Sequence, residues 1–357
     1  MFKNTKQWII ALFALFLALC IIMASVIIVI DPYFHYHGPR DDMFYTLDNE
    51  RSQNDGIIKH FKYDGMIIGT SMAENFKTSE AEELFGGRFI KVPFAGGTYR
   101  EQNENIANAI KYNPKLKTVI RPLDYAYILD DANRLRDDLG SYPDYLYDNN
   151  PFNDVNYIFN KEILFGICLP MIEQKAAGVP AGITSFDEYA VWMDTAEFGP
   201  KAVLGDRTQF NPPAEKQPFV GEVKNQVKEN ITKNVVELAK ANPDVQFYYY
   251  LTPYSVAWWG SQMELGTVDR WLAAEQYAIE LMLECDNIHL YSFNNEFDLT
   301  ADLENYSDEC HHGDWVNSQI LGWLYSGTDL LTKENYKNYL NIEAEFYRNY
   351  DYNSLIK

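Results

Sequence analysis

Cysteine is scarce in this chain of 357 residues, which contains only Cys20, Cys168, Cys285 and Cys310. No two of them have the C-x-x-C spacing of a zinc or redox site, and so few cannot form the disulfide framework of a small secreted domain. Cys285 and Cys310 could pair in an oxidising compartment, although sparse cysteines are more often buried thiols. The sequence leaves both states of this pair open.

Positive charge is also in deficit. The chain has 30 Lys and Arg against 51 Asp and Glu, for a net charge of −21. The portion after residue 30 is more acidic still, because Lys3 and Lys6 both precede it. Such a charge repels polyanions, so we expect no nucleic acid partner and no anionic membrane surface bound through a basic patch. A local basic cleft could still hold an anionic substrate.

Long apolar runs are absent apart from one. Trp8 to Ile30 contains no charged residue, and it exceeds the ~20 residues that a helix needs to cross ~30 Å of hydrocarbon. We expect a transmembrane helix over residues 8–30. Lys3 and Lys6 before it predict a cytoplasmic tail over residues 1–7 and an extracytoplasmic remainder, in a single-pass protein of the cell membrane. A cleaved signal peptide is the alternative, but its apolar core would be shorter and followed by a small-x-small site.

Residues 31–55 are predicted to connect this helix to the rest of the chain. Asp31 to Pro39 contains two prolines and a glycine among aromatic residues, which indicates an extended segment at the bilayer surface. His35 and His37 alternate there and could bind a metal, although an aromatic contact with the bilayer is the favoured interpretation.

Short apolar strands alternate with helices over residues 56–345, and this pattern is typical of a parallel sheet with helices on both faces. We therefore expect an α/β fold, a three-layer sandwich. A loop-rich insertion at about 130–221, with one helix over 155–175, interrupts the alternation, and residues 346–357 are predicted to form a tail. The strands are expected over 65–68, 88–92, 117–120, 245–251 and 287–291, and the other helices over 74–85, 99–111, 222–241, 268–284 and 315–324.

Two short strings carry the candidate chemistry. Gly69-Thr70-Ser71 directly follows the first strand, and Asp308-Glu-Cys-His311 lies near the end of the chain. A serine nucleophile, a histidine base and an aspartate that orients it would form a catalytic triad. The alternative for Ser71 is a turn residue that caps the next helix. Asp308, His311, His312 and Asp314 could instead bind a metal, but neighbouring histidines rarely share one tetrahedral ion, so we expect no metal and no other cofactor.

Other candidate residues fall at the same edge of the predicted sheet. Ser71, Gly96, Gly97 and Asp124 all follow strands, and ligands of parallel sheets bind beyond the carboxyl ends of the strands. A glycine lets a backbone N–H approach a ligand closely, so Gly96 or Gly97 could donate to an oxyanion together with Ser71. In the insertion, Trp192 and a tyrosine-rich stretch suit stacking on sugar rings, or they form a small core of their own.

Three short strings, taken in their order along the chain, resemble the motifs of a known family. Gly69-Thr70-Ser71 is similar to the Gly-Asp-Ser block of the SGNH/GDSL hydrolases, Phe94-Ala-Gly-Gly97 to their oxyanion-glycine block, and Asp308-x-x-His311 to their last block. The resemblance extends over roughly residues 60 to 325. The layout with an N-terminal anchor is similar to the D-alanyl-lipoteichoic-acid and alginate-acetylation proteins, which modify cell-envelope polymers. The resemblance implies an SGNH/flavodoxin-like domain and acyl-serine chemistry.

One departure from the family concerns the oxyanion. Members usually carry Gly-x-Asn-Asp after the third strand, with the Asn as a donor, whereas this chain has Arg121-Pro-Leu123-Asp124. Leucine cannot donate a hydrogen bond, and losing one such donor costs on the order of 10²–10³ in turnover. Arg121 could replace it, or could be a surface charge at a strand end.

We therefore expect a serine esterase or O-acyltransferase that acts on an acylated surface polysaccharide or related envelope polymer. A membrane-bound acyl-donor protein is a further candidate partner. The alternative is a non-catalytic accessory protein of envelope assembly, which the absent Asn favours.

Overall fold

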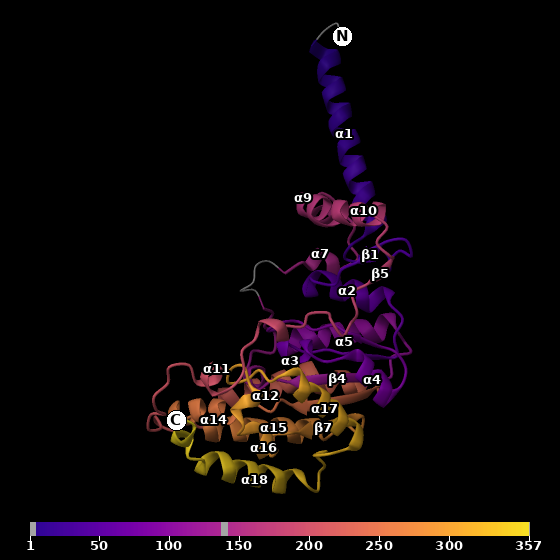
Figure 1. Ribbon diagram of the computed structural model, residues 1–357. Coiled ribbons are helices and arrows are strands. Elements are labelled where there is room, and N and C mark those ends of the chain that lie inside the picture. The colour runs from indigo at the N-terminus through magenta and orange to yellow at the C-terminus, as the bar shows by residue number, and fades with distance from the viewer. Residues whose placement is uncertain (1–4, 137–141, 357) are drawn as a thin grey trace. The chain divides into compact units, whose positions relative to one another are not determined.

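The computed structural model describes residues 5–136 and 142–356 (Figure 1). The chain forms two compact units, one of residues 1–61 with 140–185 and the other of residues 62–139 with 186–357. Residues 140–185 of the predicted insertion thus belong with the N-terminal segment, and residues 186–221 with the sheet. Parts of the predicted tail 1–7 and of the insertion lie outside the described residues.

The second unit is built on a five-stranded parallel sheet with the order β3-β2-β4-β6-β7. Counted along the chain, this is the 2-1-3-4-5 order of flavodoxin-like, doubly wound sheets, whose ligand site lies where the order reverses. That place is between β2 and β4. The prediction of an α/β fold with a parallel sheet is confirmed. The strands are β2 (Gly65–Ile67), β3 (Phe89–Lys91), β4 (Thr118–Leu123), β6 (Gln246–Leu251) and β7 (Ile288–Ser292).

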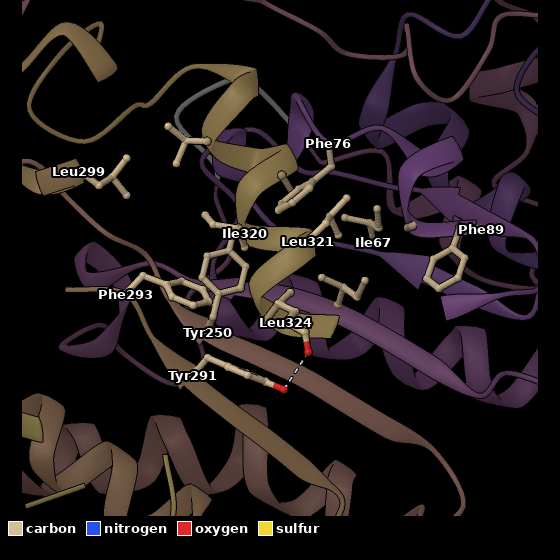
Figure 2. Close-up of a cluster of buried hydrophobic side chains, with 14 residues drawn as sticks. Ile67, Phe76, Phe89, Tyr250, Tyr291, Phe293, Leu299, Ile320, Leu321 and Leu324 are labelled. Atoms are coloured by element: carbon tan, nitrogen blue, oxygen red, sulfur yellow. Dashed lines mark hydrogen bonds between the residues drawn. The ribbon is translucent and has the colours of Figure 1, made fainter. Parts of the chain in front are cut away.

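Helices cover both faces of this sheet. On one face α17 packs Ile320, Leu321 and Leu324 into a buried cluster with side chains of all five strands (Figure 2). The hydroxyl of Tyr291 on β7 donates to the carbonyl of Leu324 at 2.9 Å. The helices of this face are α4 (Thr78–Phe85) and α17 (Asp314–Ser326), and those of the other face are α5 (Tyr99–Tyr112), α12 (Glu222–Ile231), the π-helical η3 (Thr232–Val236), α13 (Glu237–Ala241) and α15 (Val268–Met282).

The predicted helix over 74–85 is in fact two helices, α3 (Ser71–Glu74) and α4. The buried ammonium of Lys91 donates to the carbonyl oxygens of Glu74 and Phe76, the latter at 2.9 Å. Because these carbonyls have a side-chain partner, the backbone can leave the helical path between the two helices. The sequence pattern does not reveal this contact from the next strand.

Several helices lie outside the sequence prediction. The largest are α14 (Val256–Glu264) and α18 (Tyr336–Asn349), and α18 enters the predicted tail, where Tyr347 and Tyr352 are buried. These residues therefore belong to the packed unit. The remaining short elements of the second unit are α6 (Tyr125–Ile128), η2 (Met193–Thr195), α11 (Pro200–Leu204), α16 (Phe297–Thr300), η4 (Leu303–Asn305) and η5 (Tyr352–Leu355).

The first unit contains α1 (Thr5–Ile30), which is long and apolar enough to cross a membrane or to be a signal sequence. The predicted helix over 155–175 is broken near Asn160, whose side chain caps α9 by accepting the N–H of Glu162 at 2.9 Å. The other elements are the paired strands β1 (Phe44–Tyr45) and β5 (Gly182–Ile183), and α2 (Glu50–His60), α7 (Asp144–Tyr147), α8 (Val155–Ile158), α9 (Lys161–Ile163), the π-helical η1 (Leu164–Cys168) and α10 (Leu169–Ala176).

The segment after α1 is a compact turn, so the prediction of an extended connector is wrong. The buried carboxylate of Asp31 accepts the backbone N–H groups of His35, Tyr36 and His37 at 3.0, 2.7 and 2.9 Å. Three such bonds close the chain around one residue, which overrides the extended preference near the prolines. His35 Nε2 lies 3.2 Å from Asp154 Oδ1, and both ring nitrogens of His37 lie near backbone carbonyls of this unit.

Candidate active site

Ser71 lies at the turn from β2 into α3, next to the point where the strand order reverses. Thr70 caps α3 by accepting the N–H of Met72 at 3.2 Å, and its hydroxyl donates to Asp124 Oδ2 at 2.5 Å. Gly69 is required here, because a Cβ at this position would lie 2.5 Å from the Pro122 ring on β4. The turn therefore passes close to β4 and presents Ser71 at the end of the sheet.

The loop before α17 brings a histidine to this serine. His311 Nε2 lies 2.7 Å from Ser71 Oγ, and His311 Nδ1 lies 2.7 Å from Asp308 Oδ2. The other carboxylate oxygen of Asp308 accepts the backbone N–H groups of Cys310 and His311, both at 2.7 Å. These contacts hold the imidazole so that one nitrogen faces a carboxylate and the other a hydroxyl, which is the geometry of a serine triad. The structure thus brings Ser71, His311 and Asp308 together.

The charges of His311 and Asp308 suit a histidine that acts as a general base. Burial lowers the pKa of His311, but the hydrogen bond and charge of Asp308, with the charge of Asp124, outweigh this and raise it. Burial raises the pKa of Asp308, but the hydrogen bond and charge of His311 lower it below its usual range. The side chain of His311 is 31% exposed, and that of Asp308 is 54% exposed. An imidazole stabilised in its charged form can take a proton from Ser71.

The glycine turn after β3 carries two of the predicted oxyanion residues. Gly96 has a φ of +59°, and a Cβ there would lie 1.6 Å from Nη1 of Arg136. Arg136 Nη1 also donates to the carbonyl of Ala95 at 2.7 Å. The N–H of Gly97 donates to the carbonyl of Phe94 at 2.6 Å, so it is already used within the turn. The sequence did not single out Arg136, which only this close approach to Gly96 identifies.

Arg121 is not on the surface, so its interpretation as a surface charge at a strand end is wrong. It is completely buried on the α5 side of β4. Its guanidinium donates to Gln102 Oε1 at 2.8 Å and to the backbone carbonyls of Asn234 and Tyr99 at 3.0 and 3.2 Å. Because strand side chains alternate between faces, Arg121 points to the face opposite Ile120 of the α17 cluster. Its role is to join β4 to α5 and η3.

Asp124 also has partners within the protein. Besides Thr70, its carboxylate accepts the hydroxyl of Tyr254 at 3.3 Å. Burial raises the pKa of Asp124, although the hydrogen bond from Thr70 and the charge of His311 act in the opposite direction. Asp124 connects the end of β4 to the end of β2 through Thr70, and its charge acts on His311. Leu123 beside it is fully buried.

The residues of the alternative metal site do not gather. Asp314 pairs with Lys77 at 3.1 Å, and the buried His312 has its Nδ1 3.3 Å from the carbonyl of Gly313. Burial lowers the pKa of His312 to about 4. Over residues 5–136 and 142–356, no three His, Cys, Asp or Glu side chains are grouped to hold a metal ion. Cys285 and Cys310 are both free thiols.

Three aromatic side chains form a surface beside His311, which we call the aromatic wall: Trp192, Phe198 and Trp315. The ring of Trp192 meets that of His311 edge to face at 5.6 Å, and its indole N–H donates to the carbonyl of Ser71 at 3.3 Å. Phe198 joins it to Trp315, which is 45% exposed. The sequence indicated Trp192 as a sugar-stacking residue, but not the other two, which come from a loop and from α17.

No family model and no curated protein matches the chain. Among solved structures, a candidate platelet activating factor from Streptococcus pneumonia is similar at 13% sequence identity and a TM-score of 0.36, over 81% of this chain and 90% of that one.

Proposed function

We propose that this protein is a membrane-anchored serine esterase or O-acyltransferase of the SGNH type, acting outside the cytoplasm on an acylated envelope polysaccharide or related polymer. The observation that carries the proposal is the chain of two 2.7 Å contacts from Ser71 Oγ through His311 to Asp308. Its position at the reversal of a parallel sheet, where such folds bind ligands, supports it further.

The chemistry follows from the three side chains. Ser71 Oγ attacks the carbonyl carbon of an ester as its proton moves to His311 Nε2, while Asp308 stabilises the imidazolium. The tetrahedral oxyanion collapses to an acyl-serine as the bond to the ester oxygen breaks, and His311 gives its proton to that oxygen, which leaves as an alcohol. Water or a sugar hydroxyl then attacks the acyl-serine, with His311 again as base, and Ser71 is regenerated. Hydrolysis and transfer differ only in this last acceptor.

We assign the oxyanion to the N–H groups of Ser71 and Gly96 and to the guanidinium of Arg136. The close approach of Arg136 Nη1 to Gly96 supports this assignment. Gly97 has its N–H bonded to Phe94, and Arg121 is committed to α5 and η3. A guanidinium beside the oxyanion would replace the donor that Leu123 cannot supply.

The aromatic wall supports a carbohydrate as the part of the substrate that is recognised. Flat apolar rings next to a nucleophile can stack on sugar rings, and the exposed face of Trp315 is open to such a ligand. Trp315→Ala should raise KM for an acetylated oligosaccharide several-fold and leave turnover of a small aryl acetate unchanged. Tyr325→Ala is the matched control, because Tyr325 is exposed on the same helix, ~15 Å from Trp315 along its axis.

A serine-directed fluorophosphonate tests the catalytic proposal. The wild type and Ser326→Ala, which removes an exposed serine at the end of α17, should both be labelled, and Ser71→Ala should not. If the folded wild type is not labelled, the protein is not a serine enzyme, and the accessory role in envelope assembly becomes the better proposal. Labelling that survives Ser71→Ala would place the reactive serine elsewhere.

The anchor is α1, with residues 1–7 in the cytoplasm and the sheet outside. A tag after Lys357 should react with a membrane-impermeant reagent on intact cells. A tag that reacts only after the membrane is opened would contradict this topology.

A further inference from the structure

Exposed apolar side chains concentrate in one segment of the first unit. Outside α1, fourteen large apolar side chains are exposed among the described residues, and seven of them lie between residues 152 and 179. They are Phe152, Val155, Phe159, Phe165, Leu169, Ile172 and Val179. A concentration of this kind marks a surface that is covered by something else.

The segment from α9 through η1 to α10 has two distinct faces. Ile163, Cys168 and Met171 are buried against the unit, whereas Phe165, Leu169 and Ile172 are 64%, 37% and 40% exposed. The buried positions 163 and 168 are five residues apart, and the π-helical turn of η1 keeps them on one side. Residues 161–176 contain two Lys and two Glu, so this helix carries no net charge.

The segment is held next to the end of α1 by the turn at Asp31. Tyr157 on α8 donates its hydroxyl to Asp31 Oδ1 at 2.8 Å, and Asp154 accepts the hydroxyl of Tyr36 at 3.0 Å. Tyr45 donates to the carbonyl of Ile30, the last residue of α1, at 2.6 Å. Figure 1 shows α9 and α10 lying across the end of α1. A helix that leaves the bilayer at Ile30 would therefore place α9 and α10 at the bilayer surface.

A cavity of about 670 Å³ lies between α1 and α10. Val26 and Val29 of α1 and Ile172 and Ala176 of α10 line it. Arg40 and Lys175 also line it, and both bond to Asp42. Apolar walls with basic side chains suit a phospholipid, whose acyl chain would contact the walls and whose phosphate would lie near the bases.

We propose that α9, η1 and α10 form an in-plane membrane helix that inserts Phe165, Leu169 and Ile172 into a phospholipid surface. The inference rests on the proposed anchoring by α1. Because the helix has no net charge, its insertion depends on apolar burial and needs no anionic lipid. The bilayer would thus hold the first unit at two places, at α1 and along α10.

Lipid photo-crosslinking tests this inference on the full chain. The protein is reconstituted in nanodiscs of phosphatidylcholine with a diazirine on the acyl chain, irradiated and mapped by peptide mass spectrometry. Adducts are expected in residues 5–30 and in residues 161–176. Leu265, Tyr325 and Ile342 are equally exposed apolar residues of the second unit and should remain unmodified.

The triple variant F165S/L169S/I172S should lose the adducts in 161–176 and keep those in α1. These side chains are exposed, so the fold should tolerate the change, and the wild-type map alone is decisive if it does not. Adducts in α1 without adducts in 161–176 would overturn the inference and leave the anchor intact. Adducts in neither segment would overturn both, and equal modification of Leu265 and Tyr325 would show that contact with lipid is not selective.

Discussion

Two polar clusters in the second unit, one around β4 and one at the end of β2, use their hydrogen bonds in different ways. Around β4, the three donating nitrogens of Arg121 all bond to protein acceptors, and the side chain is completely buried. At the end of β2, the contacts run from Asp308 through His311 to the hydroxyl of Ser71, and Asp308 and His311 are partly exposed. Saturated, buried polar groups hold elements together, whereas a chain of contacts that ends at an accessible hydroxyl can do chemistry.

The largest effect on turnover is expected when a side chain of the cluster at the end of β2 is removed. Ser71→Ala and His311→Ala should each lower kcat for a small acyl ester by on the order of 10⁴–10⁶, because the residues of a catalytic triad act as a unit. The double variant should lose little more, and thermal unfolding should change little. The measurement is steady-state kinetics of the three variants. If the falls in kcat of the two single variants multiplied in the double variant, Ser71 and His311 would act independently, which would contradict a joint mechanism.

The carboxylate of the same cluster should have a smaller effect that depends on pH. Asp308→Asn should lower kcat by at most ~10⁴, the cost for a buried triad aspartate, since Asp308 is 54% exposed. His311 must be neutral to act as a base, so activity rises with pH through its raised pKa. Removing the Asp308 charge lowers that pKa, so the ascending limb of the kcat/KM profile should move to lower pH. An unmoved limb would show that Asp308 does not set this pKa.

Replacing Arg136 and Arg121 in turn tests the difference between the two clusters further. Arg136→Ala should lower kcat by on the order of 10²–10³, the cost of one oxyanion donor, with little effect on stability. Arg134→Ala is the control, because Arg134 is an exposed neighbour that pairs with Asp130. If kcat of Arg136→Ala equals that of the control, the donor comes from another group.

The smallest effect on turnover is expected at Arg121. Arg121→Met should leave kcat per folded molecule within about threefold of the wild type. It should lower the free energy of unfolding by about 2 kcal/mol, since Gln102 Oε1 and two carbonyls lose their donor in a buried site. Urea unfolding and active-site titration measure the two quantities. A large fall in kcat with unchanged stability would move Arg121 into the catalytic group.

Much of this arrangement follows from local sequence pattern. The uncharged run over residues 8–30 predicts α1 through its length, and the alternation of short apolar strands with helices predicts a parallel sheet. Serine after the first strand and Asp-x-x-His before the last core helix predicted three side chains that the structure brings within hydrogen-bond distance. These features need only spacing along the chain and the rule that parallel strands end at one edge.

The remaining features depended on contacts between distant residues, which spacing does not encode. Arg121 and Asp124 lie at the end of a parallel strand, as Ser71 does. Arg121 bonds to α5 and η3, however, and Asp124 bonds to the segment between β6 and α14, so both residues connect elements of the fold. Arg136 over Gly96, the aromatic wall and the break between α3 and α4 arise in the same way. The compact turn at Asp31 is local, but it depends on a bond from a side chain to the backbone that spacing does not encode either. The sequence by itself determined the strands of the sheet, the helices that cover its faces and where candidate side chains fall along them. Tertiary structure decided which polar groups are buried and saturated, because that depends on what packs against each one.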